Sequence, residues 1–215
     1  MTNEDESKVY TSQMVTLELD QTSKSRVYIH KALLISRAYL AEYFNKWASN
    51  THQETILPIT GWSMPVGSQV AHWLYTGKLS FNVNVHEDNI GDYDGLLNIF
   101  KKLAELYLGA DRYKIDDLAA HTLDKLDAIF RSRGLSWWEA MGLLGETPLD
   151  GTGKLENLLI GVVADTIVRK GWEAYTADDP SFVPWLKKSA MSPPFVVDLM
   201  RRIANSKVSR EAEAA

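Results

Sequence analysis

The stretch Trp73-Leu74-Tyr75-Thr76-Gly77 decides the fold of this chain, because it marks where an amphipathic helix ends. Upstream of it, Val66, Val70 and Trp73 recur at helical intervals, which places their side chains on one face of a helix. Gly77 is the residue type that most readily takes the left-handed conformation at a helix C-terminus. We therefore predict a helix that buries Trp73 and stops at Gly77.

Three short strands are predicted on the N-terminal side of this helix. Residues 15–19 alternate apolar and polar side chains, the period of a half-buried strand, and residues 27–29 resume as a second strand. Residues 20–25 have the composition of a turn, so the two strands should form a hairpin. From Lys31 the period becomes helical, with a break near Ser36 between two helices. Residues 55–59 then form the third strand.

Two longer helices are predicted after Gly77. Apolar residues over 96–108 and over 115–130 have helical spacing, and residues 111–114 join the two as a helical hairpin. Leu79 and Phe81 could add an edge strand before them. After residue 131 the composition changes, and further helices are predicted over about 154–170 and 195–203.

Composition excludes several classes of protein. The chain has 215 residues, 45% hydrophobic and 24% charged, with a net charge of -5, which disfavours a mainly electrostatic nucleic-acid binder. It has no cysteine, so disulfides, thiolate catalysis and cysteine–zinc sites are excluded. No apolar run approaches the roughly 20 residues that cross a bilayer, and the acidic start lacks the apolar core of a secretory signal. We expect no membrane or nucleic-acid partner, and a cytoplasmic or nuclear location, or both.

Five segments, taken in order, resemble the BTB/POZ domain family over about residues 12–130. They are Ile29-His30-Lys31, Leu33-Leu34, Tyr43-Phe44, Trp73-Leu74-Tyr75-Thr76-Gly77, and Gly109-Ala110-Asp111-Arg112-Tyr113 with Ile115 and Leu118. The resemblance implies an α+β fold: a small mixed sheet flanked by helical hairpins, followed here by a C-terminal helical extension. The C-terminal part is similar to that of short single-domain BTB proteins of filamentous fungi.

This resemblance implies an organisation into four parts. The expected parts are a disordered tail over 1–10, the BTB/POZ-like domain over 11–131, the helical extension over 132–205 and a second disordered tail over 206–215. It also implies a non-enzymatic protein–protein interaction module that acts as a scaffold or adaptor. The candidate residues for a partner or dimer interface are Met14, Val15, Leu17, Leu34, Ile35, Tyr43 and Trp47.

The family's usual partners can be compared with the residues present. Many members dimerise through the first strand and first helix, and we expect a homodimer here, although Gln13-Met14 stand where many members carry an acidic residue. If the chain is a monomer, the surface of the first strand and first helix is available to a different partner. Recruitment of a cullin-type scaffold is not implied, because Trp47-Ala48-Ser49 has serine where the hydrophobe-x-Glu motif has glutamate.

No catalytic, metal or cofactor site is expected from the residues. The five histidines have no spacing that puts two on one helical face, and His30 is expected to form hydrogen bonds at a strand–helix junction. Residues 151–155 lack the first glycine and the hydroxyl of a phosphate loop. Two alternatives stay open: a small, mostly helical enzyme whose polar groups converge only in three dimensions, and a BTB-type transcriptional regulator. The enzyme would show a closed pocket with convergent polar groups and perturbed acids.

Overall fold

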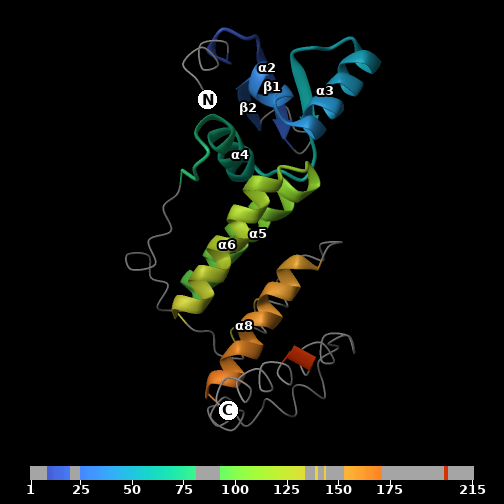
Figure 1. Ribbon diagram of the computed structural model, residues 1–215. Coiled ribbons are helices and arrows are strands. Elements are labelled where there is room, and N and C mark those ends of the chain that lie inside the picture. Colours follow the sequence, from blue (N-terminus) through green and yellow to red (C-terminus); the bar gives the residue numbers. More distant parts are fainter. Residues whose placement is uncertain are drawn as a thin grey trace. The chain divides into compact units, whose positions relative to one another are not determined.

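The computed structural model describes residues 9–19, 25–80, 93–133, 139, 143, 153–170 and 201–202 (Figure 1). The described chain is mixed α+β, with the strands close to its N-terminus and the helices mainly after them. The strands are β1 (Met14–Leu19), β2 (Arg26–His30) and β3 (Ile56–Ile59). The helices are α2 (Lys31–Ile35), α3 (Ala38–Thr51), α4 (Met64–Thr76), α5 (Tyr93–Arg112), α6 (Asp116–Arg133) and α8 (Lys154–Lys170).

The chain divides into two compact units, each made of two chain segments. The first contains residues 1–84 and 102–122, and the second contains residues 85–101 and 123–215. Helices α5 and α6 therefore each contribute residues to both units. The division differs from the predicted boundary after residue 131, because residues 123–131 cluster with the C-terminal part of the chain. The four predicted parts themselves stay a prediction.

The three strands form one sheet in the order β2-β1-β3. β1 and β2 are antiparallel, with Val15 opposite Ile29, which confirms the predicted hairpin. β3 is parallel to β1, with Leu17 opposite Leu57, and it reaches that position after α2 and α3 (Figure 1). The sheet is therefore small and mixed, as the resemblance implies.

One face of the sheet is buried and the other is open. Val15, Leu17 and Leu19 on β1 are at most 1% exposed, whereas Met14 is 42% exposed. On β2, Tyr28 is 58% exposed between buried neighbours. Successive side chains of a strand point to opposite faces, so the odd-numbered residues of β1 form the core side.

Helix α4 confirms the prediction made from the Trp73–Gly77 stretch. Trp73 is buried, and the helix ends at Gly77, whose φ of 64° is left-handed and whose N–H donates to the Trp73 carbonyl at 2.7 Å. The chain does not continue as an edge strand at Leu79, so that prediction is wrong there, and Phe81 lies outside the described residues.

Trp62 and Gly109 form a close contact between the β3–α4 connection and α5. The indole Nε1 of Trp62 donates to the carbonyl of Gly109 at 3.0 Å, and Trp62 is fully buried. A Cβ added at Gly109 would lie 2.8 Å from the indole ring, closer than real Cβ contacts allow. Glycine is therefore required at this position so that the ring can approach the helix backbone.

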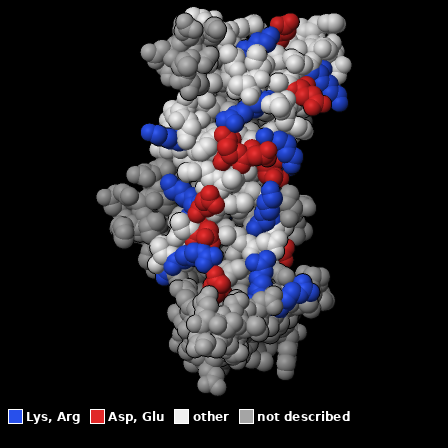
Figure 2. Space-filling model, in the orientation of Figure 1, with Lys and Arg blue, Asp and Glu red and all other residues white. Residues whose placement is uncertain are grey.

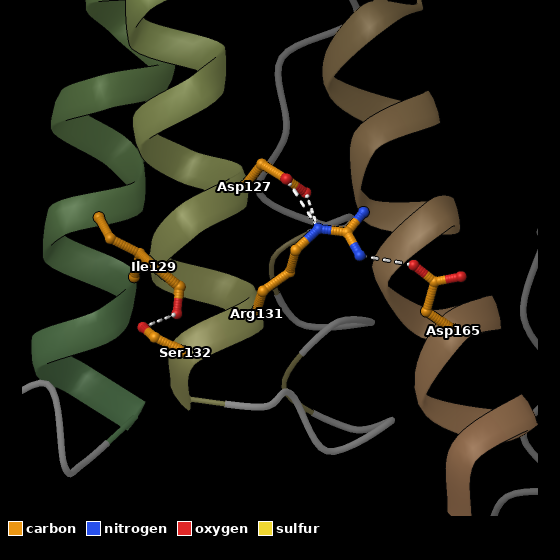
Figure 3. Close-up of polar contacts among 5 residues, drawn as sticks. All are labelled: Asp127, Ile129, Arg131, Ser132 and Asp165. Atoms are coloured by element: carbon orange, nitrogen blue, oxygen red, sulfur yellow. Dashed lines mark hydrogen bonds and ion pairs between the residues drawn. The ribbon is translucent and has the colours of Figure 1, made fainter.

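In the second unit, an arginine links α6 to α8. Arg131 donates through Nε to both carboxylate oxygens of Asp127, at 2.8 and 2.7 Å, and through Nη1 to Asp165 Oδ2 at 2.7 Å (Figure 3). In the same turn, Ser132 Oγ donates to the carbonyl of Ile129 at 3.0 Å. The predicted helix over 154–170 is confirmed as α8, and of the helix predicted over 195–203 only residues 201–202 are described, as helical.

The charged side chains of both signs are interspersed on the face drawn in Figure 2. Lysines and arginines lie beside aspartates and glutamates there, and among the described residues drawn on this face no extended area carries one sign alone. Among the helices that the structure describes, none combines the length and the apolar character needed to cross a membrane.

Candidate interaction surface

The open face of the sheet is the first candidate surface. Alternation along the strands places Met14, Thr16 and Glu18 of β1 on this face, next to Arg26, Tyr28 and His30 of β2. Arg26 Nη2 and Glu18 Oε1 form an ion pair at 2.8 Å across the two strands. One end of the face is therefore polar, and the other end is apolar and aromatic.

The aromatic end of the open face is built around His30. The His30 backbone N–H donates to the hydroxyl of Tyr75 at 3.1 Å, and the same hydroxyl lies 2.6 Å from the ring Nδ1. Tyr10 stacks on Tyr75, with ring centroids 6.3 Å apart, and meets the His30 ring edge-on at 5.8 Å. The hydrogen bonding predicted for His30 at the strand–helix junction is thus confirmed.

Three exposed side chains surround His30 and form what we call the aromatic patch: Tyr10, Met14 and Tyr28 together with His30. They are 63%, 42% and 58% exposed, in that order. Met14 pairs with His30 across the strands and is diagonal to Tyr28, within reach for side chains of this length. Clustered exposed apolar side chains beside a polar rim are typical of interaction sites.

Three residues expected at the interface are not on the surface. Val15, Leu17 and Leu34 are 0%, 1% and 1% exposed, so they pack in the core of the described fold and cannot line a surface. For Val15 and Leu17 the error follows from the two-residue period of a strand: when Met14 faces outward, Val15 and Leu17 must face inward. Met14 and Ile35 are 42% and 46% exposed, and their contact with a partner stays a prediction.

The other two expected interface residues, Tyr43 and Trp47, close the outer edge of β3. Tyr43 Oη donates to the carbonyl of Pro58 and Trp47 Nε1 donates to the carbonyl of Ile56, both at 2.9 Å. Both side chains are half-buried. Because Pro58 also lacks an N–H, this edge offers few groups to another strand. The structure gives both side chains an internal role, and their contact with a partner stays a prediction.

An aromatic cluster holds the chain after β3. The hydroxyl of Tyr113 accepts a hydrogen bond from the Thr60 N–H at 2.9 Å, and the Tyr113 ring meets Tyr43 and Trp62 edge-on at 5.6 and 5.0 Å. Burial, and next to it the Tyr113 phenol, raises the pKa of Tyr43 above its ordinary value of 10.0. The neutral phenol is therefore the form that the fold favours.

A hollow of about 290 Å³ lies between the start of α4 and α5 in the first unit. Its lining residues are Gly61, Ser63, Val66, Glu105, Leu108 and Arg112. Ser63 Oγ donates to Glu105 at 3.4 Å, and Arg112 donates to the Thr60 carbonyl at 3.1 Å. Both charged side chains are exposed, so this hollow does not have the closed, convergent character of an enzyme pocket.

Tyr10, Tyr28 and Tyr75 are the residues of this surface that were not among the interface candidates predicted from the sequence. Tyr10 falls in the predicted tail, and Tyr75 belongs to the stretch that predicts the end of α4. The only signal for Tyr75 in the sequence is its position one residue after Leu74, the last buried residue of that helix. The meeting of Tyr10 and Tyr75 at His30 depends on how α4 crosses β2, which no local pattern specifies.

Within the described residues, no group of three or more His, Cys, Asp or Glu side chains is placed to hold a metal ion. A comparison of the sequence with protein-family models finds no match. A comparison with curated proteins finds no match either. What the chain binds therefore has to be inferred from its own residues.

Proposed function

We propose that this chain is a BTB/POZ-like protein–protein interaction module, non-enzymatic, that acts as a scaffold or adaptor in the cytoplasm, the nucleus or both. The observation that carries the proposal is the aromatic patch on the open sheet face, where Tyr10, Met14 and Tyr28 are each more than 40% exposed. A second copy of the chain is one partner that this proposal includes.

The patch has the features of an interaction site rather than of an incidental exposed residue. Its aromatic rings present large area with few rotatable bonds, so ordering them on binding costs little conformational entropy. The hydrogen bonds between His30 and Tyr75 fix the middle of the patch. The ion pair between Glu18 and Arg26 forms a polar margin beside it. A few apolar anchors within a polar margin supply most of the affinity in typical interfaces.

The order of elements supports the family likeness. A strand hairpin, two helices, a parallel third strand, a helix that ends at Gly77 and then two long helices follow one another as in the BTB/POZ pattern. The hydrogen-bonded sheet under the patch suits a module that binds without changing shape.

The proposal is tested by affinity capture from the native cell with matched variants. Met14→Asp places a charge in the patch, and Met64→Asp is the control, because Met64 is similarly exposed (45%) but lies at the start of α4. Proteins that bind through the patch should be lost with Met14→Asp and retained with Met64→Asp. Burying an unpaired carboxylate in an interface is strongly unfavourable.

The same experiment can contradict the proposal. Equal capture of every partner by the Met14→Asp and wild-type chains would show that the patch is not the binding surface. Both variants change exposed side chains, so their melting temperatures should stay close to that of the wild type.

A further inference from the structure

The outward-facing backbone groups of β2 are fixed by its hydrogen-bond ladder with β1. The N–H of Lys31 donates to the carbonyl of Gln13 at 2.8 Å, which marks one hydrogen-bonded pair of the ladder. Such pairs alternate in an antiparallel ladder, so the odd-numbered residues of β2 face β1. The N–H and C=O groups of Arg26, Tyr28 and His30 therefore point to the outer edge of the sheet.

Side chains protect part of the sheet's two outer edges. On the β3 side, Tyr43 and Trp47 take the outward carbonyls of Pro58 and Ile56. On the β2 side, Tyr75 takes the outward N–H of His30. In the described part of the chain, no strand and no side chain takes the outward backbone groups of Arg26 and Tyr28, and both residues are exposed. An open strand edge of this kind is a template for another strand.

We propose that a second copy of this chain pairs with this edge, β2 against β2, antiparallel about a two-fold axis at Val27. In this register Arg26 of each copy lies opposite Tyr28 of the other, and the two residues exchange both backbone hydrogen bonds. Four hydrogen bonds form in total, and they use the outward N–H and C=O groups of Arg26 and Tyr28 in both copies. This inference rests on the proposed interaction function, because it names one partner and the surface it uses.

The other antiparallel registers are less favourable. A two-fold axis at Tyr28 would place Arg26 opposite His30, whose N–H is already bound to Tyr75. An axis at Arg26 would pair that residue with its own copy and bring two guanidinium groups together, which is repulsive. The register centred on Val27 is therefore the only one of the three that is both fully bonded and free of like-charge contact.

The side chains of the pair are also complementary. Because the two-fold axis is perpendicular to the sheet, the open faces of both copies lie on the same side. Arg26 of one copy then lies next to the Tyr28 ring of the other, an arrangement that allows a cation–π contact twice. Arg26 is held on this face by its 2.8 Å ion pair with Glu18.

The register is tested by disulfide trapping, because the natural chain contains no cysteine. Chains carrying Arg26→Cys and Tyr28→Cys are mixed under mild oxidation and the cross-linked dimer is followed with time. Directly opposed residues have Cα atoms about 5.5 Å apart, within disulfide range, so the mixture should cross-link at least about tenfold faster than either chain alone. Identical residues are roughly 8 Å apart in this register, beyond that range.

A matched control uses Lys102→Cys, an exposed position on α5, mixed with Tyr28→Cys. If the Arg26→Cys and Tyr28→Cys mixture cross-links no faster than this control, the β2 pairing is overturned.

The dimer dissociation constants of Tyr28→Pro and Tyr28→Ala, measured by sedimentation, distinguish the contribution of the backbone hydrogen bonds from that of the Tyr28 ring. Both variants lose the ring, but only proline loses the N–H, and proline is tolerated where an edge N–H faces outward. The dissociation constant of the dimer should be about fivefold or more higher for Tyr28→Pro than for Tyr28→Ala, since two hydrogen bonds are lost. Equal constants would overturn the pairing. If the Tyr28→Pro chain loses the dimer but still captures other proteins, the pairing through β2 and the proposed interaction function are tested separately.

Discussion

Trp73 is buried with its indole N–H unpaired in the described part of the chain, while its ring lies 5.0 Å from that of His121. We expect Trp73→Ala to lower the free energy of unfolding by about 3–5 kcal/mol, because a large cavity is left. Trp73→Phe should cost clearly less, since it also removes a buried donor without an acceptor. Denaturant titration measures both, and a loss below about 1 kcal/mol for alanine would contradict the burial of this ring.

At Gly109 we expect the addition of one methyl group, rather than the removal of a side chain, to lower the stability of the fold. Its Cβ would meet the Trp62 ring at 2.8 Å, and the ring is held in place by its hydrogen bond to the Gly109 carbonyl. Alanine usually stabilises a helix by about 1 kcal/mol relative to glycine, but here we expect a net loss of about 1–3 kcal/mol from overpacking. A gain in melting temperature for Gly109→Ala would show that Trp62 does not pack against this backbone.

Between elements, the hydrogen bond from Tyr43 to Pro58 fastens α3 to β3. The raised pKa of Tyr43 means that the folded state keeps its phenol proton at a pH where the unfolded chain loses it. This stability is fully present below about pH 10 and is lost as the pH rises through the folded pKa. Tyr43→Phe should therefore lower stability by about 0.5–1.5 kcal/mol at pH 7 and make the alkaline loss shallower. If the free energy of unfolding falls equally steeply above pH 10 in the wild type and in Tyr43→Phe, the expected role of the Tyr43 phenol is contradicted.

Arg131 fastens α6 to α8 within the second unit (Figure 3). The arginine is 53% exposed, so solvent screens its ion pairs, and we expect a coupling energy between Arg131 and Asp165 of only about 0.2–1 kcal/mol. A double-mutant cycle with Arg131→Gln and Asp165→Asn measures it. Asp127→Asn is the comparison for the pair inside α6. If the coupling energy between Arg131 and Asp165 is the same in 1 M salt, the ion pair is not screened by solvent and the expectation is contradicted.

At the scale of elements, local periodicity was sufficient for much of the fold. The spacing of Val66, Val70 and Trp73, with Gly77 after them, gave α4 and its end, and the alternation over residues 15–19 gave β1. The candidate surface was less predictable. The roles of Tyr43 and Trp47 depend on α3 lying beside the β3 edge, and no sequence period carries that information.

At the scale of the whole molecule, the sheet has one core face and one open face, and we propose that the open face binds partners. The alternation rule could have excluded Val15 and Leu17 from the surface once Met14 was placed on it. Tyr10 could not have been placed in the same way, because its contact with Tyr75 joins segments far apart in sequence.

Hydrogen–deuterium exchange on the chain with and without a captured partner tests the central claim most directly. Binding through the aromatic patch should slow exchange over residues 10–16 and 26–30, where the patch and its strands lie. Residues 60–66 and 105–112, around the hollow beside α4, should exchange at the same rate in both samples. Protection confined to the hollow, with the sheet segments unchanged, would contradict the account.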